Sequence, residues 1–336
     1  MSGSSSEYAV PRPDFPVFPA LKGPLMIRRH RRALTLATCG LASLLALSAC
    51  SSSSTGGSGD TGYAQSADKL ILGIVPDQQG AATQWEPLVQ YLEQSLDKDV
   101  ELVESVDYAA LIEASVAGHL DMGVISAFSY VAASNAGAKF DPIAAVVEEE
   151  GGEPGYDSVA IVPKDSGITD VAGFKGKKVC FVDYGSTSGY LYPSATLLDA
   201  GVDPEKDITP VMAGDHSLSA QKTAQGVECD AGFAQNSVVE TTGVTDGLFK
   251  EGDLRIVNRT EIPGKPIVVS TTLPKDVQKA ITDALVGISV PKIAKSGIKT
   301  PDGFVSQFWS AVATDDSYYD GVREVCELTK SAQCRP

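Results

Sequence analysis

From residue 69 onward, short apolar runs alternate with segments in which apolar residues recur every three or four positions. The continuous run at 69–75 predicts a buried strand. The segment after it predicts a helix with one apolar face, formed by Trp85, Leu88, Val89, Leu92 and Leu96. The alternation continues with expected strands at 100–106, 121–125 and 143–147 and expected helices at 108–117 and 128–136. Strands that alternate with helices predict a parallel sheet covered by helices on both faces.

A second round of the same alternation follows the glycines at 151–155. Strands are expected at 158–162, 178–182, 208–212 and 230–234. Helices are expected at 188–199, 216–225, 275–286 and 317–328. Two α/β rounds of similar rhythm are compatible with several functions, so the fold does not by itself choose among them.

The N-terminal segment has a different character from the rest of the chain. Residues 1–25 are rich in Ser and Pro, which leaves Met1 and Met26 as two candidate starts. Four arginines between 28 and 32 precede an uncharged stretch at 33–49, which ends Leu-Ser-Ala-Cys at Cys50. A basic flank, an apolar stretch and small residues before a cleavage point are typical of a secretory signal. The ending resembles a bacterial lipobox, which implies that Cys50 is lipidated.

The alternative for this segment is a single transmembrane helix, because an apolar stretch of about 17 residues approaches the lower limit for crossing a bilayer. The small residues, the cysteine and the Ser/Gly-rich linker at 51–68 favour the lipoprotein. We therefore expect an N-terminal extension and signal at 1–50. The mature protein would be extracytoplasmic and held on the bacterial cell membrane by its lipid.

Composition and charge narrow the range of possible partners. The 336 residues include 27 Lys and Arg against 43 Asp and Glu, for a formal charge of −16. Nucleic acid and anionic membrane surfaces would repel such a chain, so neither is an expected partner through charge. The apolar fraction of 43% is sufficient for sizeable cores. The three histidines, His30, His119 and His216, are not spaced to share a helix face, and no Cys-x-x-Cys occurs, so no metal centre is expected.

Six cysteines remain to be assigned. Two of them fall in the signal, and the others are Cys180, Cys229, Cys326 and Cys334. An even number of cysteines in an oxidising compartment indicates disulfides, and three pairings are open. Cys326 and Cys334 lie eight residues apart after a helical segment, whereas Cys180 and Cys229 fall in two apolar runs that are candidates for neighbouring strands. The sequence favours these two pairs, both in a structural role.

The most informative motif is Asp-Tyr-Gly-Ser-Thr-Ser-Gly-Tyr-Leu-Tyr-Pro at 183–193, between an expected strand and an expected helix. Ser186, Thr187 and Ser188 would lie at the helix N-terminus, where free N–H groups and the helix dipole suit a tetrahedral oxyanion. Ordinary N-capping is the alternative. A nucleophile elbow would need Ser in place of Thr187, and a phosphate-binding P-loop would need a Gly-Lys-Ser/Thr that is missing.

Further motifs, in matching order and spacing over residues 70–325, resemble the phosphate/phosphite/phosphonate substrate-binding proteins of ABC importers. They are Asp107-Tyr108, Gly155-Tyr156, Ser186-Thr187-Ser188-Gly189, Gly214-Asp215-His216, Asp230-Ala231-Gly232 and Ile262-Pro263-Gly264-Lys265-Pro266. The resemblance implies an α/β, two-lobe, type II periplasmic binding protein with mostly parallel sheets. Lobe 1 would be 69–155 and 267–336, and lobe 2 would be 156–266. Two hinge crossings would lie near Tyr156 and Pro266.

The resemblance also implies a binding site for a small phosphorus oxyanion. The ligand-binding residues would be Tyr108, Tyr156, Ser186, Thr187, Ser188 and His216. Neutral donors and a helix dipole bind an oxyanion without a buried counter-charge that must lose its water. The protein would bind and deliver its ligand without making bonds, with no cofactor, and its partners would be an ABC permease and ATPase.

Two positions depart from the family pattern. Members that bind an aminoalkyl phosphonate have carboxylates where this chain has Ser237 and Lys265. An aminophosphonate is therefore a less favoured ligand than a plain oxyanion. Lys265 is either a further ligand for a more highly charged anion or a solvated hinge residue. We expect the acidic run at 148–150 to be a solvated loop and His119 to lie in a surface turn.

Two rival functions remain open. One is a binding lipoprotein that serves a sensor instead of a transporter, whose pocket would look the same. The other is a hydrolase that uses Asp183, Ser188 and His216, which requires His216 to act as a base toward a serine.

Overall fold

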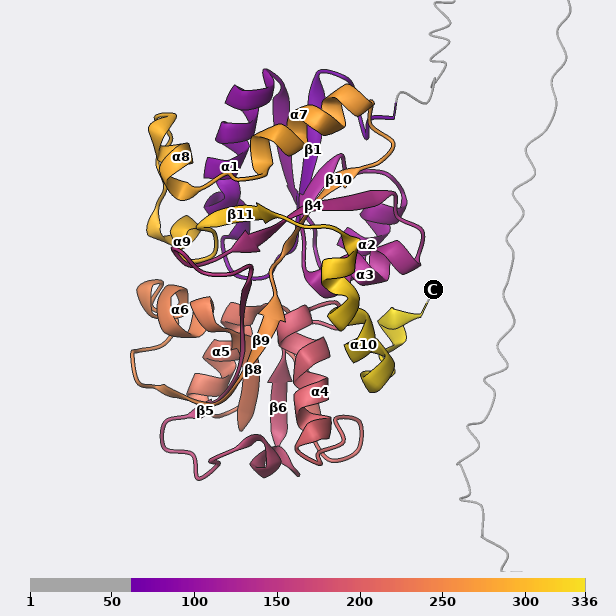
Figure 1. Cartoon of the computed structure of the whole chain (residues 1–336). Coiled ribbons are helices and arrows are strands. Elements are labelled where there is room, and N and C mark those ends of the chain that lie inside the picture. The colour runs from indigo at the N-terminus through magenta and orange to yellow at the C-terminus, as the bar shows by residue number, and fades with distance from the viewer. Residues whose placement is uncertain (1–61, 336) are drawn as a thin grey trace, which may run out of the picture. The chain divides into compact units, whose positions relative to one another are not determined.

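Eleven strands lie within residues 62–335, the part of the chain that the computed structural model describes. They form one sheet in which the main order is β2-β1-β3-β10-β4-β5-β8-β6-β7, with β11 on β4 and β9 on β5. Figure 1 shows β1, β4, β10 and β11 grouped together, and β5, β6, β8 and β9 grouped beside them. The signal at 1–50, Cys50 and the first part of the 51–68 linker lie outside the described residues. Within them, no helix has both the length and the apolar character needed to span a membrane.

The first half of the sheet contains the strands before residue 150 and two that return to it later. They are β1 (Lys69–Ile74), β2 (Asp99–Glu104), β3 (Met122–Val124), β4 (Phe140–Val147), β10 (Pro266–Ser270) and β11 (Ser310–Ala313). The helices that follow or connect these strands are α1 (Ala81–Leu96), α2 (Tyr108–Val116), α3 (Ala127–Asn135), α7 (Lys275–Leu285), α8 (Val290–Lys295), α9 (Asp302–Val305), η4 (Asp316–Tyr319), α10 (Asp320–Thr329) and η5 (Ala332–Cys334).

The second half contains the strands between residues 155 and 263. They are β5 (Gly155–Pro163), β6 (Lys178–Phe181), β7 (Thr209–Met212), β8 (Ala231–Gln235) and β9 (Leu254–Pro263). Its helical segments are η1 (Val171–Phe174), η2 (Thr187–Leu191), α4 (Tyr192–Asp199), α5 (His216–Gln225), η3 (Val238–Thr242) and α6 (Gly243–Thr245). The π-helical turn η2 runs directly into α4, so residues 187–199 form one helical segment.

The cores confirm the predicted helix faces. In α1, Trp85, Leu88 and Leu92 are buried against the first half of the sheet, and Trp85 meets the rings of Phe304 and Phe308 edge-on. Burying a large apolar side chain contributes on the order of 2–3 kcal/mol, so this packing stabilises α1 against the sheet.

Two passages of the chain connect the halves. The first passage leads from β4 to β5, two strands that are aligned at a single residue pair, Val147 with Gly155. The second passage is Gly264 and Lys265, which join β9 to β10. These passages lie where the sequence predicts hinge crossings, near Tyr156 and Pro266. The assignment of 69–155 and 267–336 to one moving lobe and of 156–266 to the other stays a prediction.

The fold class is as predicted, but the expectation that most strands pair in parallel is wrong. Among the described strands, five pairings are parallel and five are antiparallel. The strands expected from the sequence do not include β9, β10 or β11, and these strands supply four of the antiparallel pairings. Strand β10 inserts between β3 and β4 because the chain returns to the first half there. Strand direction is a tertiary property that local periodicity does not contain.

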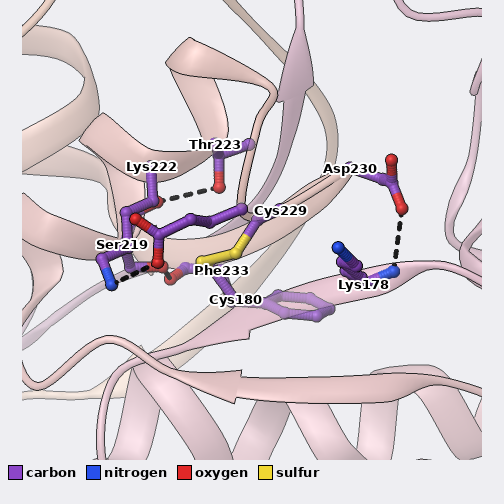
Figure 2. Close-up of a disulfide and its surroundings, with 9 residues drawn as sticks. Lys178, Cys180, Ser219, Lys222, Thr223, Cys229, Asp230 and Phe233 are labelled. Atoms are coloured by element: carbon purple, nitrogen blue, oxygen red, sulfur yellow. Dashed lines mark hydrogen bonds and ion pairs between the residues drawn. A yellow bond between two sulfur atoms is a disulfide. The ribbon is translucent and has the colours of Figure 1, made fainter.

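Two disulfides are present, with the pairing that the sequence favours. Cys180 of β6 is joined to Cys229, which lies two residues before the neighbouring strand β8, and Cys326 of α10 is joined to Cys334. Beside the first disulfide, the Lys178 N–H donates to the Asp230 carboxylate at 2.9 Å (Figure 2). The second disulfide folds the last residues back onto α10, which contacts both α3 and α4.

We expect the two disulfides to differ in their contribution to stability. They close loops of 49 and 8 residues, so chain entropy predicts a loss of roughly 4 kcal/mol for Cys180→Ala with Cys229→Ala and roughly 2.5 kcal/mol for Cys326→Ala with Cys334→Ala. Urea denaturation of the two double variants measures both losses. A larger loss for the C-terminal pair would contradict this ordering.

Candidate functional site

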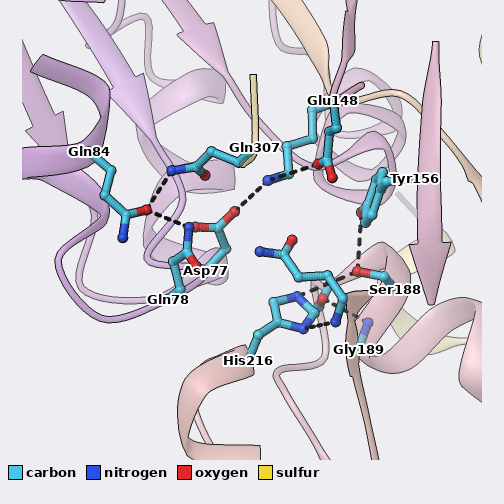
Figure 3. Close-up of polar contacts among 12 residues, drawn as sticks. Asp77, Gln78, Gln84, Glu148, Tyr156, Ser188, Gly189, His216 and Gln307 are labelled. Atoms are coloured by element: carbon cyan, nitrogen blue, oxygen red, sulfur yellow. Dashed lines mark hydrogen bonds and ion pairs between the residues drawn. The ribbon is translucent and has the colours of Figure 1, made fainter. Parts of the chain in front are cut away.

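Polar side chains from both halves of the sheet meet in one buried cluster. Most of them lie close to the end of a strand or at the start of the following helix, where ligands bind in open α/β sheets. We call this set the buried polar cluster: Asp77, Gln78, Tyr108, Glu148, Tyr156, Ser186, Thr187, Ser188, His216, Gln235, Ser237, Thr242 and Lys265. All seven ligand-binding residues expected from the sequence belong to it. Figure 3 shows Tyr156 and His216 converging on Ser188.

The Ser-Thr-Ser segment begins the helical stretch at 187–199. Ser186 is its N-cap, and its Oγ accepts a hydrogen bond from the Gly189 N–H at 3.0 Å. The capping interpretation and the anion-site interpretation therefore apply to the same residue. The flanking glycines have a steric role, because a Cβ on Gly185 would lie 2.6 Å from the Cβ of Tyr108 and one on Gly189 would overlap Val182. Only glycine lets the motif approach both neighbours so closely.

Thr187 also connects the two halves of the sheet. Its Oγ1 accepts from the backbone N–H of Phe128 at 2.8 Å, at the start of α3. The hydroxyls of Ser126 and Ser129 donate to the carbonyl of Gly185 at 3.0 and 3.1 Å. The start of α3 is thus fastened to the Ser-Thr-Ser segment, a contact that the sequence does not predict.

His216 is a neutral hydrogen-bond donor. The backbone N–H of Gln235 donates to its Nδ1 at 2.9 Å, so Nδ1 is the accepting nitrogen and Nε2 carries the proton. Nε2 lies 3.4 Å from Ser188 Oγ, which also accepts from the Tyr156 hydroxyl at 3.1 Å. Burial lowers the pKa of His216 to about 3, although Asp77 acts in the opposite direction. The imidazole therefore stays uncharged at neutral pH and offers Nε2–H to the cluster.

This geometry rules against the hydrolase. A base must accept the serine proton at Nε2, and here that nitrogen already carries one. Asp183, the third member of the suggested triad, accepts from the Gly185 N–H at 2.8 Å. The three residues lack the chain of donors and acceptors that nucleophilic catalysis requires.

Both tyrosines are buried with their hydroxyls in the cluster. Tyr108 hydrogen-bonds to the side chain of Ser186, and burial together with the charge of Asp77 raises the pKa of Tyr108 well above its usual value. Burial likewise raises the pKa of Tyr156, with Lys265 acting in the opposite direction. Both phenols keep their protons at neutral pH and are donors for an anion.

Lys265 forms a buried ion pair, so its interpretation as a solvated hinge residue is wrong. The residue is 3% exposed, and its Nζ lies 2.9 Å from Asp77 Oδ2 and 3.8 Å from Glu148 Oε1. Burial opposes the lysine charge, yet the carboxylates of Asp77 and Glu148 raise the pKa of Lys265 above its usual range. Lys265 is charged, and its charge is balanced inside the protein.

Glu148 corrects a second expectation, because the acidic run at 148–150 is not wholly solvated. Glu148 is buried, whereas Glu149 and Glu150 are exposed. Burial raises the pKa of Glu148 to about 8, with Lys265 acting in the opposite direction. His119, by contrast, is exposed, as the sequence predicts for a surface turn.

Sequence reasoning missed Asp77 and Gln235. Asp77 follows β1 at its carboxyl end, and Gln235 is the last residue of β8. Their positions at strand ends were the available signal. Asp77 Oδ1, both side-chain polar atoms of Gln235 and the Ser237 hydroxyl are buried without a hydrogen-bond partner in the described part of the chain. Buried polar atoms of this kind are rare in folded proteins and are normally satisfied by ordered water or a ligand.

Comparison with known proteins identifies the family to which this chain belongs. Residues 72–317 match the family of ABC transporter, phosphonate, periplasmic substrate-binding proteins. The phosphate-import protein PhnD of Mycolicibacterium smegmatis is 36% identical over 93% of this chain and 100% of its own length. The phosphonates-binding periplasmic protein of Escherichia coli is 27% identical over 66% of this chain and 67% of its own.

Solved structures share the fold. The binding protein component of an ABC phosphonate transporter from Pseudomonas aeruginosa superposes with a TM-score of 0.67 at 23% identity, covering 78% of this chain and 86% of that one. PhnD1 of Prochlorococcus marinus, solved with methylphosphonate, gives 0.67 at 20% identity, covering 79% and 99%. With the family match over most of its length, the chain belongs to the periplasmic substrate-binding proteins of phosphonate and phosphate ABC transporters, which are binding proteins and not enzymes.

Proposed function

We propose that this protein is a lipid-anchored binding protein that captures a phosphorus oxyanion without an amino group, phosphate first, and delivers it to a permease. The observation that carries the proposal is the group of buried neutral donors around the helix start at 187. They are the hydroxyls of Tyr108, Tyr156, Ser186, Thr187 and Ser188 and the Nε2–H of His216.

Neutral donors suit a small anion for an energetic reason. A bare lysine or arginine in the pocket would lose its hydration on burial, and this cost offsets much of the gain from pairing with the anion. Hydroxyl and imidazole N–H groups have a smaller desolvation cost, and hydrogen bonds to a charged partner contribute about 1.5–3 kcal/mol each. The positive end of the helical segment at 187–199 adds to this attraction.

The buried ion pair disfavours an aminophosphonate. Family members that bind an aminoalkyl phosphonate are expected to have carboxylates at the positions of Lys265 and Ser237. Here the ammonium of Lys265 already pairs with Asp77 at 2.9 Å and lies 3.8 Å from Glu148. The ammonium of a ligand would meet a second positive charge in a buried site, which costs free energy.

We propose phosphate as the preferred ligand because the relative at 36% identity is a phosphate-import protein. Phosphite and methylphosphonate have the same tetrahedral shape and similar charge, so the donors of the cluster fit them as well. The three ligands differ in one substituent on phosphorus, which binding measurements distinguish.

Capture would use closure of the two predicted lobes, 69–155 with 267–336 and 156–266. In this proposal the described contacts would belong to the closed form, a view supported by the backbone N–H of His216, which donates to the Asp77 carbonyl at 2.8 Å. The Thr242 hydroxyl likewise donates to Gln78 Oε1 at 3.2 Å. Bending near Tyr156 and Pro266 would separate these groups and open the site. The closed form would then dock on an ABC permease and its ATPase; a sensor domain is the rival partner, and the pocket does not distinguish the two.

For the ligand, we expect calorimetry of the mature chain, residues 50–336 in detergent, to show binding of phosphate, phosphite and methylphosphonate. 2-Aminoethylphosphonate should bind about tenfold more weakly or worse, because its ammonium adds an unpaired positive charge beside Lys265. No binding of any of the four at millimolar concentration would refute the proposed function. Preferential binding of the aminophosphonate would refute the role given to Lys265.

For the site, we expect His216→Ala to lose about 1–3 kcal/mol of phosphate-binding free energy, the value of one buried hydrogen bond to a charged group. The same calorimetry measures this loss. His119→Ala is the matched control, because His119 is exposed and lies outside the cluster. Equal affinities of the two variants would remove His216 from the site.

For the anchor, we expect Cys50→Ala to release the protein from the membrane fraction of a bacterial host and to abolish labelling by radioactive palmitate. The reason is that the thiol of Cys50 is the proposed attachment point of the lipid. Cys39→Ala, within the same segment, is the control and should keep both properties. Membrane retention of the Cys50 variant would favour the transmembrane alternative.

A further inference from the structure

Helix α10 lies against both halves of the sheet. It contacts α3 of the first half and α4 and η2 of the second, and Figure 1 shows it between α3 and α4. Val322 and Cys326 are buried on its inner face, in an apolar cluster that also contains Val131 of α3 and Leu191 of η2. One apolar core therefore spans the two predicted lobes, and α10 forms part of it.

The N-terminal end of α10 is fastened to the first half of the sheet. The hydroxyl of Tyr130, on α3, donates to the carboxylate of Asp316 at 2.5 Å, and the ring of Tyr130 lies 5.3 Å from the ring of Tyr319. Arg323 of α10 forms an ion pair with the same Asp316 carboxylate. Because these contacts hold η4 and α10 on α3, α10 would move with lobe 1 in the proposed closure.

The C-terminal end of α10 is fixed by the second disulfide. Lys330 has a left-handed backbone conformation, with a φ of 54°, which ends the helix and turns the chain back. Cys334 then joins Cys326, and the Cys334 carbonyl accepts from the Asn135 side chain of α3 at 3.0 Å. A cavity of about 660 Å³ lies between residues 328–333 and the second half of the sheet. Close packing against that half therefore does not fix this end of α10.

We propose that α10 and its disulfide form a clasp that holds the two lobes in the closed form, which makes Cys326 and Cys334 positioning residues for retention of the bound anion. The inference rests on the proposed function, because it assigns the clasp a role in lobe closure. Opening would move α10 away from α4 and η2 and expose the apolar face that carries Val322 and Cys326. Exposing apolar surface costs free energy, so the clasp favours the closed form.

The disulfide matters because α10 is short. A helix of ten residues is marginally stable by itself, so its last turn depends on support from its surroundings. Without the disulfide, the turn that carries Cys326 is held only by noncovalent contacts, and its packing against α4 weakens. The closed form is then less populated, and a ligand that binds this form binds less tightly in proportion. Release of the ligand should accelerate, because the ligand leaves through the open form.

The first experiment removes each disulfide in turn from the mature chain in detergent. We expect the clasp variant, Cys326→Ala with Cys334→Ala, to bind phosphate about tenfold more weakly in calorimetry. It should also release radioactive phosphate faster into an excess of unlabelled phosphate. The matched control is Cys180→Ala with Cys229→Ala, because both of these cysteines lie in the second half of the sheet. The control variant should keep the wild-type affinity and release rate.

The control variant also separates positioning from stability. The disulfide between Cys180 and Cys229 closes the longer loop, so its loss should destabilise the protein more. If binding only followed stability, the control variant would bind phosphate more weakly than the clasp variant. The clasp predicts the reverse order. Equal affinity and release in the two variants, or a larger effect in the control, overturns the clasp and leaves the proposed function standing.

A second pair of variants keeps both disulfides. Val322→Ala reduces the buried face of α10, and Val277→Ala makes the same change on α7, in the core of the first half. Val322→Ala should speed phosphate release about threefold or more, because the apolar contact that favours closure is smaller. Val277→Ala should leave the release rate unchanged. Equal release rates from these two variants contradict the clasp.

Hydrogen exchange tests the clasp without any ligand. The backbone N–H of His216 donates to the Asp77 carbonyl across the two halves, and it lies at the start of α5, which Figure 1 shows well apart from α10. In ligand-free protein, this amide should exchange about tenfold faster in the clasp variant than in the wild type or the control variant. Equal exchange at His216 in the three proteins overturns the clasp. If the wild type binds none of the oxyanions, the proposed function fails, and the exchange measurement still decides whether α10 controls opening.

Discussion

The ion pair between Lys265 and Asp77 is the interaction on which the chemistry of the site depends. It joins the connection between β9 and β10 to the end of β1, and both side chains are almost fully buried. Burying two charges costs desolvation free energy, and their mutual attraction offsets this cost only if they pair closely. Removal of one member of such a pair typically costs about 3–5 kcal/mol of stability. The pair also uses up the one positive side chain in the cluster. In the proposed site, anion binding is therefore left to neutral donors.

The neutral donors are held in place by backbone groups. The N–H of Gln235 sets the tautomer of His216, the N–H of Gly189 orients Ser186, and the N–H of Phe128 holds Thr187. Each of these hydrogen bonds restricts the rotamer of its side chain and therefore the position of the donor group. Such preorganisation reduces the entropy that binding must offset.

Several residues of the proposed binding site also make contacts between the two halves of the sheet. Thr187 fastens α3 to the second half of the sheet, and the backbone of His216 is bonded to Asp77 across the same boundary. In the proposed mechanism, the closed form is therefore stabilised by the same segments that hold the anion. A ligand that bridges them shifts the protein toward closure, because it binds this form better than the open one.

Much of the fold could be predicted from the sequence. The apolar face of α1 and the start of α5 at His216 follow from periodicity and capping, which involve residues within one or two turns of each other. Strands β9 and β11 could not be predicted in this way, because β9 has mixed polarity and β11 is short, so their pairing partners and not their own pattern define them. Strand β10 is a buried apolar run, Pro-Ile-Val-Val-Ser, whose signal was present in the sequence and was missed.

The candidate site likewise combines local features, which the sequence predicts, with long-range contacts, which it does not. The sequence by itself determined that Ser186, Thr187 and Ser188 begin a helix and that hydroxyls gather there, because capping is local. The tertiary structure alone decided the state of Lys265: its partner Asp77 lies 188 residues away, and Glu148 approaches from a third segment. The charge of a side chain that can be either solvated or buried depends on which distant groups the fold brings to it, and no local pattern contains that information.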